Sequence, residues 1–103
     1  MTSFNDVLLD SDATMAGYTA EHRYETIDAT NDTFDLDVKI LDSQGYQVSE
    51  TVDVEVSVGG SFQTAITNQY ISGSGYTSIS GTFPQGIDKY GDSWTVRLVT
   101  NLG

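Results

Sequence analysis

The chain has 103 residues, with 15 acidic against 4 basic side chains and no cysteine. This length allows one compact domain and excludes two. Without cysteine there is neither a disulfide framework nor a thiolate zinc site. The longest apolar run, Val7 to Leu9, is far short of the roughly 20 residues of a membrane-spanning helix. A net charge of −11 repels phosphate backbones and anionic lipids, which argues against nucleic-acid and membrane partners.

Residues 1–55 carry 13 of the 15 acidic side chains. The apolar residues of the first 32 positions follow neither a strand period nor a helix period. We interpret residues 1–32 as an extended N-terminal arm with early strands near residues 5–10 and 17–28. The remainder, residues 33–103, is predicted to form a single β-sandwich domain. The chain is rich in Thr, Ser, Gly and Val and poor in good helix formers, which favours an all-β fold.

Clear strand signals begin at residue 33. Residues 34–40 alternate apolar side chains with Asp and Lys, which places one face in the core and the other in solvent. The sequence Asp42-Ser43-Gln44-Gly45 predicts a tight turn. Residues 52–58 alternate Val with polar residues and predict a second strand with one buried face.

The second half of the chain repeats this pattern. Further strands are expected at residues 62–67, 76–83 and 92–100, separated by Gly-containing turns. In the last strand Trp94 shares a face with Val96 and Leu98, so we expect Trp94 in the core. Seven or so short strands at this spacing are typical of an antiparallel β-sandwich.

Two segments resemble the immunoglobulin-like domains of bacteria and phages. They are the Asp42-to-Val48 turn with the Val-rich strand after it, and Gly91-Asp92-Ser93-Trp94-Thr95-Val96. In that family a D-x-x-G-x-x-V hairpin precedes a Val-rich strand, and a G-x-Y/W-x-V-x-V strand closes the sandwich. The resemblance covers residues 33–100 and implies an immunoglobulin-like fold with a role on a virion or cell surface. Its motifs describe turns and core, not chemistry.

The sequence does not predict an enzyme, a cofactor or a metal site. Its one histidine, His22, has no second imidazole for a metal, and no G-x-S-x-G elbow is present. Acidic pairs two residues apart, Asp10/Asp12, Asp35/Asp37 and Asp53/Glu55, each share a strand face. We interpret them as solvated side chains, and calcium binding is the alternative.

We therefore predict a phage virion structural protein, a capsid decoration (cement) protein that bridges capsomers. If Met1 is the native start, the missing secretory signal implies synthesis in the host cytoplasm, followed by assembly on the capsid surface. The expected partners are the major capsid protein and other copies of this chain, a trimer suiting three-fold positions. The alternatives are another head-tail component, or an immunoglobulin-like surface or adhesin module that binds a protein or a glycan.

The arm is the predicted interface. Its apolar side chains have no pattern that a lone sandwich would bury, so we expect them to dock on another subunit. These residues are Phe4, Val7, Leu8, Leu9, Met15 and Tyr18.

Overall fold

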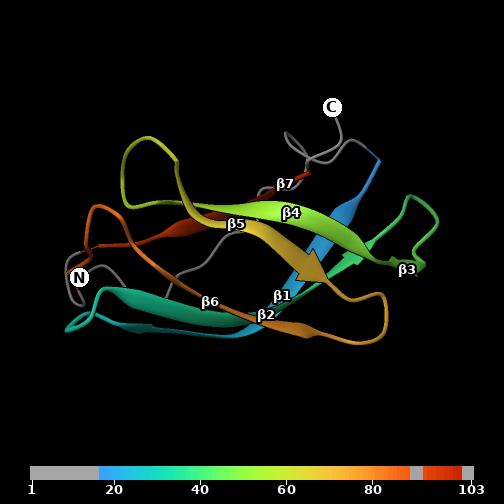
Figure 1. Ribbon diagram of the computed structural model, residues 1–103, viewed down its shortest axis with the longest axis horizontal. Helices are drawn as coiled ribbons and strands as arrows, with labels where there is room; N and C mark the ends of the chain where they lie inside the picture. Colours follow the sequence, from blue (N-terminus) through green and yellow to red (C-terminus); the bar gives the residue numbers. More distant parts are fainter. Residues whose placement is uncertain (1–16, 89–91, 101–103) are drawn as a thin grey trace.

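The computed structural model describes residues 17–88 and 92–100, which form two antiparallel β-sheets packed face to face (Figure 1). The described strands are β1 (Thr19–Asp28), β2 (Thr33–Leu41), β3 (Gln47–Val48), β4 (Glu50–Ser57), β5 (Gln63–Ile71), β6 (Thr77–Thr82) and β7 (Thr95–Thr100). The predicted all-β, antiparallel sandwich is confirmed. No helix within the described ranges has the length and apolar character needed to cross a membrane.

The strands divide into a four-stranded and a three-stranded sheet. In the four-stranded sheet β2 is central: it pairs with β1 along one edge, and along the other with β6 and, near its end, with β3. The three-stranded sheet has the order β5-β4-β7. The chain therefore changes sheet between β3 and β4, between β5 and β6, and between β6 and β7.

The core lies between the sheets and follows the alternation seen in the sequence. The even-numbered residues 34–40 of β2 and 52–56 of β4 are buried, and the residues between them point outward. Val96 and Leu98 of β7 and Ile79 of β6 join the same cluster. Burial of these side chains supplies the main favourable free energy of folding.

Three aromatic rings fill one end of the core. Phe34, Phe83 and Trp94 have ring centroids 5.1 to 5.3 Å apart, in tilted and edge-to-face arrangements. Gly81 of β6 pairs with Phe34, and a Cβ added there would lie 2.7 Å from the Phe34 ring. The absence of a side chain at Gly81 therefore leaves room for the Phe34 ring. Trp94 is 1% exposed, so the prediction of a core tryptophan is confirmed.

The predicted turn at residues 42–45 is present. The Asp42 carboxylate accepts hydrogen bonds from the backbone N–H groups of Gln44 (2.9 Å) and Tyr46 (3.0 Å). Gly45 has a φ of 89°, a left-handed conformation that glycine adopts without steric cost. The turn joins β2 to the two-residue β3, after which the chain enters β4 in the other sheet.

The early strand expected near residues 17–28 corresponds to β1, which is paired with β2 from Thr19 to Asp28. This part of the predicted arm is therefore a strand of the sandwich. The other early strand, expected near residues 5–10, lies outside the described residues.

Candidate functional site

The outer face of the four-stranded sheet carries rows of interacting polar side chains. Arg23 of β1, Asp37 of β2 and Ser78 of β6 form one row: Arg23 Nε donates to Asp37 Oδ2 (3.2 Å), and the Ser78 hydroxyl donates to Asp37 Oδ1 (2.7 Å). In neighbouring rows Lys39 pairs with Glu21 (3.4 Å), and the hydroxyl of Ser80 donates to Asp35. The strand register produces these contacts, because directly paired residues point to the same face.

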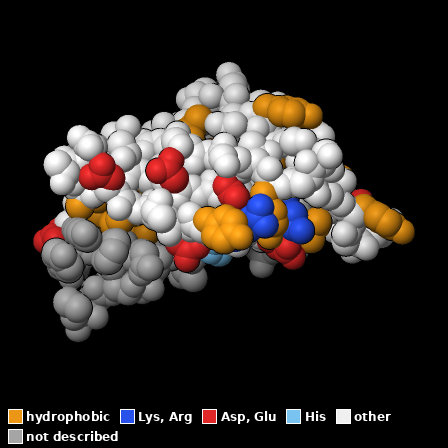
Figure 2. Space-filling view, turned by 90° about the horizontal axis from the view of Figure 1, so that it is seen from below, with side chains coloured by type: hydrophobic (Ala, Val, Ile, Leu, Met, Phe, Trp, Pro, Cys, Tyr) orange, Lys and Arg blue, Asp and Glu red, His pale blue; other side chains and the backbone are white. Residues whose placement is uncertain are grey.

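Two tyrosine rings flank the basic side chains of this face. The Arg23 guanidinium carbon lies 4.0 Å from the ring centroid of Tyr76 and 4.7 Å from that of Tyr24. Lys39 Nζ lies 4.8 Å from the Tyr76 ring. Figure 2 shows this gathering of orange hydrophobic and blue basic side chains, with red acidic ones beside it. We call Arg23, Tyr24, Asp37, Lys39 and Tyr76 the tyrosine–arginine face.

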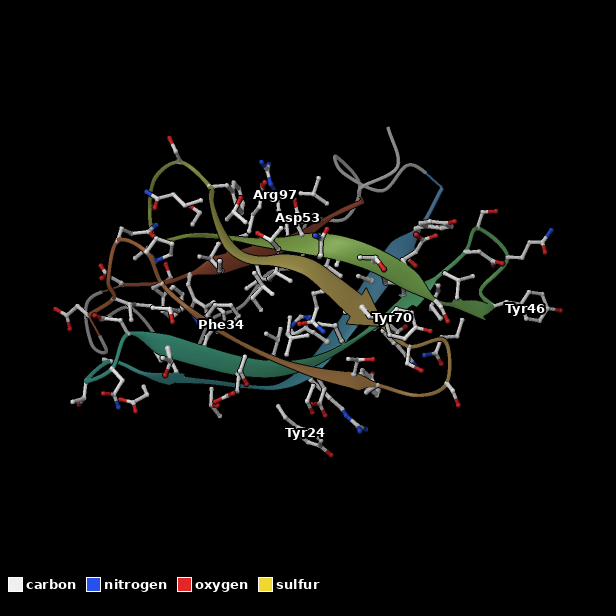
Figure 3. All side chains as sticks on the ribbon, in the orientation of Figure 1. Tyr24, Phe34, Tyr46, Asp53, Tyr70 and Arg97 are labelled. Atoms are coloured by element: carbon white, nitrogen blue, oxygen red, sulfur yellow. The ribbon has the colours of Figure 1, made fainter. Side chains whose placement is uncertain are left out.

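Tyr24 is held outward by an irregularity in β1. The pairing of β1 with β2 changes register between Arg23 and Thr26, and Tyr24 has a φ of 58°. A bulky residue seldom adopts this left-handed conformation, which costs on the order of 1–3 kcal/mol. The Tyr24 side chain is 71% exposed and points away from the sheet (Figure 3). The fold thus presents an aromatic ring to solvent at an energetic cost.

The charges of this face are held in place by their neighbours. The hydrogen bond from the Ser78 hydroxyl, followed by that from the Arg23 guanidinium and its positive charge, lowers the pKa of Asp37 below its ordinary value of 3.8. Asp37 is therefore a carboxylate at neutral pH. It fixes one side of the Arg23 guanidinium while the rings of Tyr24 and Tyr76 lie against it. The result is a pre-ordered surface of aromatic rings and fixed hydrogen-bonding groups.

Two other tyrosines are strongly exposed. Tyr46 is 69% exposed at the β2–β3 turn, and Tyr70 is 57% exposed on β5 (Figure 3). Both have ordinary negative φ angles. They are therefore useful controls for Tyr24.

The outer face of the three-stranded sheet contains a second aromatic and ionic group. Arg97 Nε donates to Glu55 Oε1 (2.7 Å), and the Arg97 guanidinium carbon lies 4.0 Å from the ring centroid of Phe62. Asp53 Oδ1 accepts a hydrogen bond from the backbone N–H of Asn68 (3.0 Å). Phe62, unlike Tyr24, is half-buried. These contacts hold neighbouring segments of the sheet together.

The predicted acidic pairs can now be placed. Asp35 and Asp37 share the outer face of β2, and Asp53 and Glu55 share that of β4, but each carboxylate is held by the serine, arginine or backbone groups described above. Within residues 17–88 and 92–100 no three His, Cys, Asp or Glu side chains are grouped as a metal ion would require. Asp10/Asp12 lies outside the described residues.

Most of the predicted interface also lies outside the described residues: Phe4, Val7, Leu8, Leu9 and Met15. Tyr18 is described, and it packs against the core of its own chain. Its hydroxyl donates to Glu50 Oε2 at the start of β4 (3.1 Å), and this hydrogen bond and the charge of Glu50 raise the Tyr18 pKa above 10.0. Tyr18 therefore anchors the beginning of β1 to the three-stranded sheet.

The sequence reasoning missed the tyrosine–arginine face. The adjacent pair Arg23-Tyr24, which contains one of only four basic residues, was the available signal. The bulge that turns Tyr24 outward and the register that brings Tyr76 beneath Arg23 depend on pairing between distant strands. Neither can be read from local periodicity.

Comparisons of this chain with known protein families, with curated proteins and with solved structures find no match.

Proposed function

We propose that this protein is a phage virion structural protein, a capsid decoration protein that docks on the major capsid protein through its tyrosine–arginine face. The observation that carries the proposal is Tyr24, a left-handed residue that is 71% exposed and whose ring is braced by Arg23. Tyrosine and arginine dominate the energetically important positions of protein interfaces. A ring that is already fixed loses little side-chain entropy when a partner covers it.

Other properties support a structural role on an outer surface. The sandwich has one continuous core, and its net charge of −11 suits a shell exterior better than a surface that contacts DNA. The order β1-β2-β6 in one sheet and β5-β4-β7 in the other supports the immunoglobulin-like reading. We propose synthesis in the host cytoplasm, assembly on the capsid surface and a homo-oligomer, a trimer at three-fold positions. Many copies would then multiply a modest interface into avidity.

A second candidate function is a glycan-binding surface module of the same fold class. The observation that favours it is an exposed Tyr24 ring beside the hydrogen-bonding groups of Arg23 and Asp37, because sugars are bound by stacking on aromatic rings and by polar side chains. Trp94 cannot serve this purpose, because it is buried. Binding of the intact protein to a glycan array, abolished by Tyr24→Ala, would favour this function over the first.

The decoration proposal is tested by binding to shells. Empty capsids assembled from the major capsid protein of the same genome, without this protein, are titrated with the purified chain. The proposal predicts saturable binding, a copy number set by capsid symmetry and a higher temperature of shell disruption. Unsaturable or absent binding would overturn the proposal.

A further inference from the structure

The guanidinium of Arg23 uses only part of its hydrogen-bonding capacity within the described chain. Its Nε donates to Asp37 Oδ2 (3.2 Å), whereas its two Nη nitrogens donate to no group in residues 17–88 and 92–100. A guanidinium holds its N–H donors in one plane, and all but one of them are on the Nη nitrogens. The Arg23 side chain is 46% exposed, so most of its donors remain for a partner.

The acceptors beside Arg23 are already in use. Asp37 Oδ1 accepts a hydrogen bond from the Ser78 hydroxyl (2.7 Å), and Asp37 Oδ2 accepts that from Arg23. Glu21 Oε1 lies 3.4 Å from Lys39 Nζ. The face therefore offers a partner unused donors, and a complementary surface has to supply oxygen acceptors.

Two rings and a carboxylate hold the guanidinium in one orientation. Its carbon lies 4.0 Å from the ring centroid of Tyr76 and 4.7 Å from that of Tyr24, and Asp37 fixes its Nε. An arginine that is ordered before binding loses little side-chain entropy when a partner arrives. Two parallel N–H groups of a guanidinium match the two oxygens of a carboxylate, and this charge-assisted pair is stronger than a bond to a neutral carbonyl.

The local charge also favours a carboxylate. Arg23 and Lys39 are two of only four basic residues in the chain, and both lie against the ring of Tyr76 (Figure 2). Exposed charges farther away than about 8 Å are largely screened at physiological ionic strength, so the net charge of −11 has less influence here than these two cations. Asp37 also repels a carboxylate, but it occupies the Nε side of Arg23, farther from a group that contacts the Nη nitrogens.

We propose that Arg23 binds a carboxylate of the partner protein, an Asp or Glu side chain that accepts hydrogen bonds from its Nη nitrogens while the Tyr24 ring packs beside it. This inference rests on the proposed function, because it takes the tyrosine–arginine face as the docking surface. It adds the chemistry of the partner, which is an acidic side chain next to an apolar patch. Tyr24 supplies contact area, and Arg23 selects a surface with the carboxylate in the right place.

Arg97 on the other sheet provides the matched control. Its Nε also donates to a carboxylate, that of Glu55, and its guanidinium lies against the ring of Phe62. The Arg97 side chain is less exposed, at 29%, and no second ring of the described residues lies against it. Arg97 should therefore bind a carboxylate more weakly than Arg23 does.

Titration of the intact, ¹⁵N-labelled chain with sodium acetate tests the preference of Arg23 without any capsid shell. Acetamide, which is neutral and similar in shape, and sodium chloride at equal ionic strength are the control solutes. Acetate should shift the guanidinium ¹⁵N signals of Arg23 roughly threefold farther than those of Arg97, and the controls should shift neither. Equal shifts at the two arginines, or equal shifts with acetate and acetamide, would overturn the proposal.

Binding to empty capsid shells tests whether the carboxylate belongs to the partner. Shells are treated with a carbodiimide and methylamine, which convert exposed carboxylates to neutral amides, before the chain is added. Treatment should weaken binding of the parent and of Arg97→Gln roughly tenfold. Arg23→Gln should bind untreated shells about as weakly as the parent binds treated ones, and treatment should change its binding little, because the interacting pair is already broken.

The outcomes separate this inference from the proposed function. If Tyr24→Ala weakens binding while Arg23→Gln binds as the parent does, the face is the docking surface and the carboxylate is wrong. A loss on treatment that is equal for the parent and Arg23→Gln would also overturn the carboxylate. Absence of parent binding to untreated shells would overturn the proposed function, and the acetate titration would then still decide whether Arg23 is a carboxylate site.

Discussion

The outer faces of the two sheets contain the same elements in different arrangements. Each has an arginine paired with a carboxylate and stacked on an aromatic ring: Arg97 with Glu55 and Phe62, and Arg23 with Asp37 and Tyr76. In the three-stranded sheet the ring of this group, that of Phe62, is half-buried. In the four-stranded sheet a further ring, Tyr24, is turned out to solvent by a bulge.

This difference separates an arrangement that stabilises a sheet from one that is available to a partner. The Arg97 side chain is 29% exposed and the Arg23 side chain 46%. The left-handed backbone at Tyr24 costs free energy, and the ring that it turns out to solvent contacts Arg23. A face that retains such strain is a better candidate for binding than one whose contacts are all internal.

The largest loss of stability is expected from a substitution in the core that lies between the two sheets. Phe34→Ala removes a fully buried ring from the aromatic group with Phe83 and Trp94, and should lower the free energy of unfolding by about 3–5 kcal/mol in urea titrations. Both faces should lose order together, because they share one core. Independent melting of the two sheets would show that their faces cannot be compared as parts of one cooperative unit.

A smaller loss of stability is expected from a substitution on the outer face of the three-stranded sheet. Phe62→Ala removes the ring against which Arg97 lies and should cost about 1 kcal/mol of stability, while binding to capsid shells stays unchanged. Thermal unfolding and shell titration of the same preparation provide both values. A loss of shell binding without a loss of stability would reverse the roles assigned to the two faces.

Relief of strain should produce a change in the opposite direction. Tyr24→Gly replaces a left-handed tyrosine with the residue best suited to that conformation, so stability should stay the same or rise by up to about 1 kcal/mol. Tyr70→Gly is the control, since it changes an exposed tyrosine at an ordinary strand φ and should cost about 1 kcal/mol. If both substitutions destabilise equally, Tyr24 carries no strain.

The smallest effect concerns the charge that fixes Arg23. Ser78→Ala removes the main cause of the lowered Asp37 pKa, so the pKa of Asp37 should rise in the variant. A lowered pKa in the folded state adds stability above the unfolded pKa, and that stability is lost as the pH falls through the folded pKa. The variant and the parent should therefore differ at neutral pH and converge in acid. An NMR titration of the Asp37 carboxyl carbon measures the shift, and an unchanged pKa would contradict the assigned cause.

The sequence predicted those features that depend on local alternation. The alternation predicted the buried faces of residues 34–40 and 52–56, but at residues 57–58 it fails, because Ser57 is buried and Val58 is half-buried. The turn at residues 42–45 and the core position of Trp94 were also predicted. Strand boundaries were less accurate: β5 extends to Ile71 instead of residue 67, and β7 begins at Thr95 instead of residue 92. Backbone pairing with β4 sets these limits, and periodicity does not encode it.

The candidate site was beyond sequence reasoning for the same reason. Arg23, Asp37 and Ser78 come from three strands, and their contact requires the register of β1 and β6 on β2. The strained backbone of Tyr24 lies where the pairing of β1 with β2 is irregular. The pairs Asp35/Asp37 and Asp53/Glu55 were correctly placed on strand faces, but their serine and arginine partners were not visible in the linear sequence.

The most direct test compares the three exposed tyrosines as shell-binding residues. Tyr24→Ala, Tyr46→Ala and Tyr70→Ala each remove one strongly exposed ring, and all three variants should remain folded. If the tyrosine–arginine face is the docking surface, Tyr24→Ala should weaken binding to empty capsid shells at least tenfold, as expected for a residue central to an interface. Tyr46→Ala and Tyr70→Ala should bind as the parent does. Equal binding by all three variants, or a loss confined to Tyr46→Ala or Tyr70→Ala, would contradict the account.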